Sequence, residues 1–163
     1  PIYNTPFFLK FIPLYRQNFQ MFCVFLYFFV SYFQKTNHNN KGETMYLKKR
    51  VEEVEAKPQK AGSGVSMRML ISPDEASNFA MRNFVIESGG YMPVHTNTVE
   101  HEQYVLSGKA SVQIGDGEIE AQAGDVLLIP AGVPHGYRTI GDEPYSFLCL
   151  VPNREDKIEI LSC

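Results

Sequence analysis

The sequence is poor in cysteine, has no extended basic cluster and contains no apolar run long enough to span a membrane as a helix. Its three cysteines, Cys23, Cys149 and Cys163, make a poor disulfide framework for 163 residues. Disulfide-dependent folds belong to oxidising compartments, so we expect a reducing, cytoplasmic location. Cys149 lies in the apolar run 147–151, where a small buried thiol is the expected role.

Basic residues are also too few and too scattered for a nucleic-acid-binding surface. Residues 45–163 carry 11 Lys/Arg and 17 Asp/Glu, which gives 11 − 17 = −6. Phosphate contacts require clustered Lys and Arg. The basic run 48–50 is short, and the acids Glu52 and Glu53 follow it, as on a solvated face. We therefore expect a small-molecule ligand or substrate as partner, and no nucleic acid.

Residues 1–44 differ in composition from the rest of the chain. Of the 21 aromatic residues, 13 fall within residues 1–33, as in translated AT-rich noncoding DNA. The apolar run 21–30 is too short for a membrane-spanning helix, which needs about 20 apolar residues. It is also not followed by the small residues of a signal-peptide cleavage site. We predict an untranslated or disordered hydrophobic leader outside the fold, with translation starting at Met45. The alternative is a genuine membrane anchor, and a membrane partner is expected only in that case.

The rest of the chain, residues 45–163, has the length of one domain. Residues 45–64 are charged and interrupted by Pro58 and small residues, which predicts an arm and linker. Residues 65–152 contain short β-type runs separated by Gly and Pro, and residues 153–163 are expected to form a C-terminal tail. The expected strands are 65–71, 79–87, 92–96, 101–106, 110–114, 118–121, 126–129, 134–139 and 145–151. Short strands at even spacing predict an all-β fold, an antiparallel β-barrel or jelly roll.

Three histidines fall on these expected strands. Alternate residues of a strand share a face, which pairs His95 with Asn97, His101 with Gln103, and His135 with Tyr137. Three inward imidazoles from three strands can meet inside a small barrel, and neutral imidazole is the commonest protein metal ligand. A single histidine on a strand is more often a satisfied polar residue, and that alternative stays open.

Two neighbours of these histidines are candidate catalytic residues. Gln103 shares the face of His101 and would bind substrate or a metal-bound water, unless it only fills the barrel. Tyr137 shares the face of His135 and would donate a hydrogen bond or act as an acid, unless it is an aromatic wall.

The spacing of glycine, proline and histidine resembles the two motifs of the cupin superfamily, G(X)5HXH(X)3,4E(X)6G and G(X)5PXG(X)2H(X)3N. The first is matched in spacing by Gly89, His95, Asn97, His101 and Gly108, and the second by Gly124, Pro130, Gly132, His135 and Thr139. The resemblance covers most of residues 65–152. It implies a single-domain cupin, a jelly-roll-like double-stranded β-helix. Small cupins are often dimers, so we expect a homodimer, to which residues 45–64 would contribute.

The chain departs from these motifs at three positions. Asn97 stands where the family has its second histidine, His101 where it has glutamate, and Thr139 where it has asparagine. The resemblance implies that His95, His101 and His135 bind one divalent transition metal. Asn97 would be a weak oxygen ligand or a hydrogen-bonding neighbour. Manganese, iron or zinc is expected, and nickel or copper also suits imidazole.

Three neutral ligands would leave the ion its full double charge and open coordination positions, as in catalytic or ligand-binding sites. We therefore expect a small metalloenzyme, dioxygenase-like or a metal-assisted isomerase or hydrolase. The alternative is a non-enzymatic module that binds a small molecule or metal, such as a sensor. With ordinary histidine pKa values, metal binding should fail over roughly pH 5 to 6.5.

Overall fold

The structure is a computed structural model, and it describes residues 46–161 of the chain. The predicted start at Met45, the leader 1–44, and both Cys23 and Cys163 lie outside the described residues. Within residues 46–161 there is no helix of the length and apolar character needed to cross a membrane. The one helix of this part is η2 (Val51–Glu53), a single 3₁₀ turn.

Ten β-strands make up the fold of the described residues. They are β1 (Lys57–Pro58), β2 (Ser63–Ile71), β3 (Phe79–Asn97), β4 (His101–Ser107), β5 (Lys109–Ile114), β6 (Gly117–Gln122), β7 (Val126–Ile129), β8 (His135–Ile140), β9 (Tyr145–Pro152) and β10 (Ile158–Ile160). Every strand pair is antiparallel. The predicted all-β, antiparallel, jelly-roll-like fold is confirmed.

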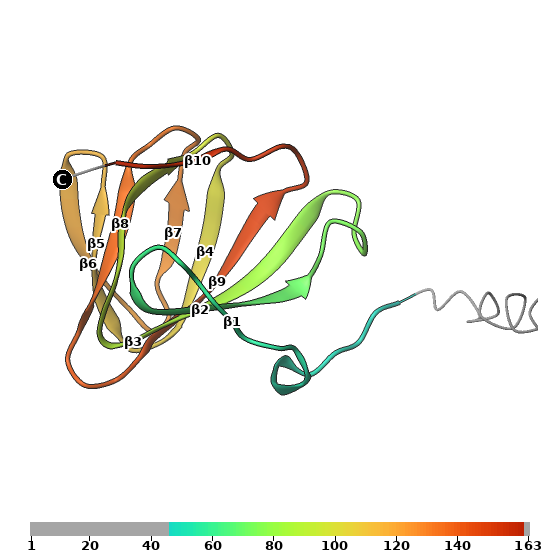
Figure 1. Cartoon of the computed structure of the whole chain (residues 1–163), viewed down its shortest axis with the longest axis horizontal. Coiled ribbons are helices and arrows are strands. Elements are labelled where there is room, and N and C mark those ends of the chain that lie inside the picture. Colours follow the sequence, from blue (N-terminus) through green and yellow to red (C-terminus); the bar gives the residue numbers. More distant parts are fainter. Residues whose placement is uncertain (1–45, 162–163) are drawn as a thin grey trace, which may run out of the picture. The chain divides into compact units, whose positions relative to one another are not determined.

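Many of the strand pairs join strands that are not consecutive in the sequence. Their hydrogen-bonded order is β6-β5-β8-β3-β9-β4-β7, with β2 and β10 also paired to β3, and β1 paired to β2. β5 and β6, which correspond to the expected strands 110–114 and 118–121, form a hairpin in which Ile114 is the partner of Gly117 across the turn. The sheet curls on itself, so one face of most strands looks inward (Figure 1).

The long strand β3 differs from the prediction. Two strands, 79–87 and 92–96, were expected, with a break at Ser88-Gly89-Gly90, whereas the structure has one continuous strand. Its first half pairs with β9 and its second half with β8, and the strand bends between them (Figure 1). Gly89 has φ +71°. Because glycine adopts this left-handed backbone without a steric cost, the chain bends here and changes partner without ending the strand.

Both segments that flank the predicted barrel contribute strands. In the segment 45–64, β1 pairs with β2, so that Lys57 is opposite Met67. In the segment 153–163, β10 pairs with the end of β3, so that Ile158 is opposite Asn97 and Ile160 opposite His95. Neither strand was predicted, because two or three residues carry too little periodicity to be recognised.

The core follows the two-residue period of the strands. In β9, Tyr145, Phe147 and Cys149 are buried and alternate with half-buried residues. The Tyr137 and Phe147 rings stack with centroids 5.2 Å apart. Burying one such aromatic side chain contributes about 1.5–3 kcal/mol. Cys149 is 1 % exposed, as expected from its apolar neighbours.

Candidate functional site

The three predicted histidines come together inside the curled sheet. His95 lies near the end of β3, and His101 and His135 are the first residues of β4 and β8. They are 7 %, 5 % and 2 % exposed. The His135 ring centroid lies 4.3 Å from that of His95 and 5.2 Å from that of His101. Strand pairing explains one of these contacts, because His95 and His135 are register partners between β3 and β8.

The turn before His135 sets the position of this side chain. The Gly132 N–H donates to the Asn97 carbonyl oxygen at 2.7 Å, and the Gly115 N–H donates to the Pro134 carbonyl oxygen at 2.7 Å. Gly132 has φ +78°, a conformation that glycine adopts readily. These two hydrogen bonds hold the turn between β3 and the β5–β6 hairpin. His135, which follows Pro134, then begins β8 beside His95.

Backbone carbonyl groups select the tautomer of two of the imidazoles. Nδ1 of His95 lies 2.9 Å from the Pro93 carbonyl oxygen, and Nδ1 of His135 lies 2.9 Å from the Val133 carbonyl oxygen. A carbonyl oxygen only accepts, so each Nδ1 carries the proton and donates it. The lone pair of each neutral ring is therefore on Nε2, the arrangement commonly found in metal-binding histidines.

Two further acceptor atoms at this site, Oδ1 of Asn97 and Oε1 of Gln103, are buried and have no hydrogen-bond partner, and neither has the buried Nε2 of His101. The Asn97 amide orientation is well determined, because its Nδ2 donates to the Asp156 carboxylate at 2.6 Å and a carboxylate can only accept. The Gln103 Nε2 donates to the Tyr137 hydroxyl oxygen at 2.6 Å. Buried acceptors without a donor are uncommon in folded proteins, and a bound cation would satisfy them.

Burial keeps the three imidazoles neutral. Loss of solvation on burial lowers the pKa of all three rings and is the largest cause in each case. The pKa of His101 falls to about 3 and that of His135 to about 4, and the pKa of His95 is lowered as well. The positive charge of Arg82 lowers all three further. Neutral rings are the form that binds a metal. The window of about pH 5 to 6.5 expected for ordinary histidines therefore moves to lower pH.

The same residues line a cavity of about 240 Å³. The three histidines, Asn97 and Gln103 contribute polar groups to its lining, and most of the other lining residues are apolar. The apolar lining includes Met67, Met69, Phe84, Met92 and Phe147. Ile158 and Ile160 of β10 also line it, as do Gln59 and Ala61 of the segment between β1 and β2. A polar group of ligating atoms beside an apolar wall is typical of a small-molecule site.

Tyr137 and Thr139 lie on the same strand, β8, but have different surroundings. Burial raises the pKa of Tyr137 far above its ordinary value, so its hydroxyl group stays protonated beside Gln103. This favours hydrogen bonding over proton transfer. Thr139 Oγ1 lies 3.1 Å from the carbonyl oxygens of both Glu87 and Gly90, at the bend of β3, and does not line the cavity.

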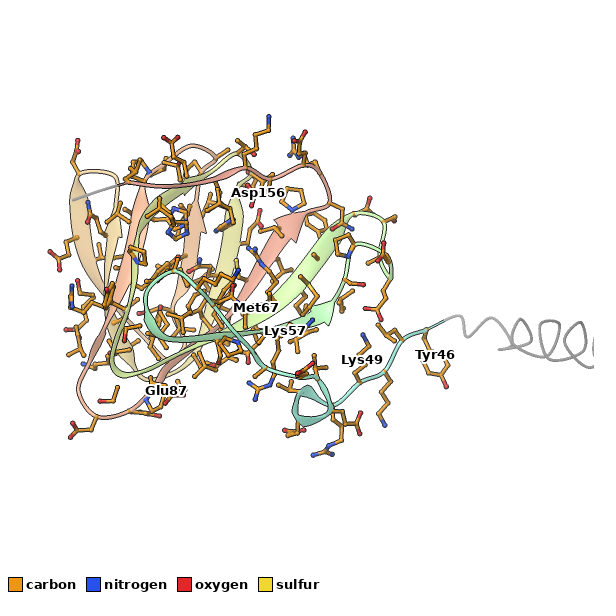
Figure 2. The ribbon with its side chains drawn as sticks, viewed as in Figure 1. Tyr46, Lys49, Lys57, Met67, Glu87 and Asp156 are labelled. Carbon is orange, nitrogen blue, oxygen red and sulfur yellow. The ribbon has the colours of Figure 1, made fainter. Side chains whose placement is uncertain are left out.

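Three cavity or neighbouring residues were not expected at this site from the sequence. Arg82 and Cys149 line the cavity, and Asp156 holds the Asn97 side chain. Asp156 is labelled in Figure 2, on the C-terminal segment that leads into β10. No motif marks these residues. Strand parity could have indicated Arg82. It lies two residues before Phe84, so both side chains are on the same face of the strand, and both line the cavity.

The side chains suit a divalent transition metal by their chemistry. Three imidazoles with available lone pairs and two amide oxygens surround the cavity, and imidazole binds such ions well. In the part of the chain that the structure describes, no three His, Cys, Asp or Glu side chains are already close enough round one point to form a complete metal site. The fit therefore lies in donor type and tautomer, and the side chains would have to close round a bound ion.

Comparison with known proteins identifies the family of the barrel domain. Residues 82–151 match the family model described as a cupin domain. The chain is 39 % identical over 69 residues to oxalate decarboxylase OxdC of Bacillus subtilis, which covers 39 % of this chain and 18 % of that protein. It is 26 % identical over 80 residues to 1-methylthio-D-xylulose 5-phosphate methylsulfurylase of Rhodospirillum rubrum, which covers 49 % of this chain and 51 % of that protein. The matched part thus spans at most about half the length of these curated relatives.

Solved structures agree on the fold. The polyketide cyclase RemF from Streptomyces resistomycificus superposes with a TM-score of 0.68 at 27 % identity, over 73 % of this chain and 87 % of that one. A cupin-2 domain protein of Rhodospirillum rubrum superposes with a TM-score of 0.62 at 23 % identity, over 71 % and 80 %. The fold, the inward histidines and the family match define a β-barrel of the small, conserved-barrel kind. The chain contains a cupin domain over residues 82–151.

Proposed function

We propose that this cupin binds one divalent transition metal through His95, His101 and His135, with the Asn97 amide oxygen as a further weak ligand, and acts on a small molecule in the adjoining cavity. The observation that carries the proposal is the tautomer of His95 and His135. Each ring donates from Nδ1 to a carbonyl oxygen of its own strand or turn, which leaves the Nε2 lone pair available.

A divalent ion held by these neutral groups would supply a Lewis acid with open coordination positions. The chain's own residues would do the rest. The hydrogen bond between Gln103 and Tyr137 holds the Gln103 amide beside His101, where its free oxygen can accept a hydrogen bond from a ligand. The apolar side chains that line the cavity would displace water from around a bound molecule and strengthen polar interactions there.

The similar proteins favour an enzyme. The curated relatives are named as a decarboxylase and a methylsulfurylase, and the similar structure from Streptomyces as a cyclase. These names describe three different reactions on one fold, so they support small-molecule chemistry without selecting a reaction. We propose a dioxygenase-like activity or a metal-assisted isomerisation or hydrolysis. A homodimer and a cytoplasmic location remain predictions.

One observation favours the alternative, a non-enzymatic binding or sensor module. Burial raises the pKa of Tyr137 far out of the neutral range and also raises the pKa of the Cys149 thiol. The three histidines are already assigned to metal binding. The described cavity therefore offers no side chain suited to general acid–base catalysis at neutral pH, and such catalysis would depend on water bound at the metal.

Metal analysis of the purified protein tests the proposal. Protein from a metal-replete culture should contain about one equivalent of transition metal per chain, and His135→Ala should lose it. Tyr137→Phe is the matched control, because it changes the same strand and cavity but keeps every proposed ligand. A wild-type protein that is folded by circular dichroism and free of metal would contradict the site.

Turnover separates the two functions. Oxygen consumption by the metal-loaded protein with small thiols, diketones or phenolic acids would support the dioxygenase-like activity. Product formation without oxygen uptake would support isomerisation or hydrolysis. Tight binding of one of these compounds without turnover would support the binding module instead.

A further inference from the structure

Arg82 brings a positive charge to the wall of the cavity. It lies on β3 and lines the cavity together with His95, His101 and His135. Its guanidinium carbon lies 5.3 Å from the centre of the Phe84 ring, and its Nη2 donates to the Cys149 sulfur atom at 3.1 Å. Its Nε is buried and has no hydrogen-bond partner. The guanidinium group is therefore positioned by neutral side chains and keeps donor capacity unused.

No carboxylate of the described residues forms an ion pair with Arg82. The ion pairs found within residues 46–161 all use other side chains. Asp156 lines an adjoining hollow together with Arg82, but its two carboxylate oxygens accept hydrogen bonds from Asn97 and from the Thr98 backbone N–H. A partly buried cation without a direct ion-pair partner keeps donors available, so an anion entering the cavity would gain a charge-assisted hydrogen bond from Arg82.

The other cavity groups indicate which kind of anion fits. A single guanidinium group matches the charge of one carboxylate, and its planar donors match the two oxygens of that group. A phosphate group carries more charge at neutral pH and would call for further cations, whereas Arg82 is the one Lys or Arg that lines the cavity in the described structure. The remaining wall, with Met67, Met92 and Phe84, suits an apolar body.

We propose that the cavity binds a small organic carboxylate, with the carboxylate group paired to Arg82 and the apolar part packed against the methionines and Phe84. This inference rests on the proposed function only in placing the ligand in the same cavity, since the pairing with Arg82 requires no metal. Arg82 is then the residue that selects an anionic ligand over a neutral one of the same shape.

Benzoate and its neutral analogue benzamide are suitable probes. Calorimetric titration of the metal-replete wild-type protein should show tighter binding of benzoate than of benzamide. Arg82→Met removes the charge but keeps an apolar side chain of similar length. It should weaken benzoate binding at least tenfold and leave benzamide binding unchanged.

Arg138→Met is the matched control. The Arg138 guanidinium carbon also lies 5.3 Å from an aromatic ring centre, that of Tyr91, but Arg138 does not line the cavity. This variant should bind benzoate like the wild type. If Arg82→Met does not fold, Arg82→Lys serves instead. Because a lysine is a point charge without the planar donors, it should give an intermediate affinity.

Three outcomes would overturn the inference: equal wild-type affinity for benzoate and benzamide, unchanged benzoate affinity when Arg82 is replaced, or tighter Arg82-dependent binding of inorganic phosphate. Repeating the titrations after chelation separates the two proposals. A protein that never contains metal but still discriminates benzoate through Arg82 supports the inference and contradicts the metal site. A protein that binds metal but shows no preference for benzoate supports the metal site and contradicts the inference about Arg82.

Discussion

Asp156 accepts a 2.6 Å hydrogen bond from Nδ2 of Asn97, a residue 59 positions earlier in the chain. The Thr98 backbone N–H donates to the other carboxylate oxygen of Asp156 at 3.0 Å. Because the carboxylate takes the amide nitrogen, the Asn97 oxygen is left free at the cavity. The segment that leads into β10 thus determines which atom of Asn97 faces the proposed metal site.

Asp156→Asn should weaken metal binding. The new amide can donate to the Asn97 oxygen and turn that side chain, so that its nitrogen faces the cavity. Losing such an outer partner typically costs about 10- to 100-fold in metal affinity. Competition with a metal indicator would measure the change in folded protein. Glu159→Gln on β10 is the control and should have no effect, since Glu159 is exposed.

A double-mutant cycle shows whether Asp156 acts through Asn97. In the Asn97→Ala background, Asp156→Asn should leave metal affinity nearly unchanged, because no amide remains to be turned. An equal loss in both backgrounds would mean that Asp156 stabilises the C-terminal segment and does not position a ligand.

Asn97→His tests why this chain lacks the family's second histidine. Imidazole is a stronger metal ligand than an amide oxygen, so the variant should bind the metal at least tenfold more tightly. It should also leave fewer coordination positions open. The visible absorption spectrum of the cobalt-substituted protein would report the added ligand. An unchanged spectrum and affinity would show that position 97 does not contact the metal.

The stability of the metal-free protein should fall as the pH is lowered from 7. The pKa of His101 is about 3 and that of His135 about 4 in the folded chain, against an ordinary value of 6.5. Below pH 6.5 the unfolded chain takes up protons that the folded chain does not, so stability is complete above pH 6.5 and is lost towards pH 4. Each such imidazole contributes a slope of up to about 1.4 kcal/mol per pH unit.

Urea unfolding at several pH values would measure this dependence. His135→Gln removes one of the titrating groups and should give a shallower slope than the wild-type protein. A wild-type stability that does not change between pH 7 and pH 4.5 would contradict the description of the histidines as buried and neutral.

Gly108→Ala should destabilise the barrel more than Gly89→Ala. Both glycines have φ +71°, so an alanine costs about 1–2 kcal/mol in backbone strain at either position. At Gly108 the added Cβ would also collide with the Pro144 carbonyl oxygen, whereas at Gly89 it would meet open space. We expect a loss of about 3–4 kcal/mol at Gly108 by chemical denaturation. Equal losses would exclude close packing as the role of Gly108.

Much of the site was predictable because strand parity is a local property. The expected same-face pairs, such as His101 with Gln103 and His135 with Tyr137, are buried in the structure as expected. The continuity of β3 was not predictable. Ser88-Gly89-Gly90 has the composition of a turn, and only the pairing with β9 and then β8 keeps this stretch extended.

Local sequence patterns were sufficient to predict the fold class and to select the three histidines as one candidate site. Alternating side chains, turn glycines and the spacing of the two motifs are all properties of short segments. Two features are visible only in the three-dimensional structure. Arg82 and Cys149 line the cavity and Asp156 binds Asn97 beside it, and β10 pairs with the end of β3. The physical reason is that these contacts join segments about sixty residues apart, such as Asn97 and Asp156 at a separation of 59. Their register depends on how the whole sheet curls, which no local pattern encodes.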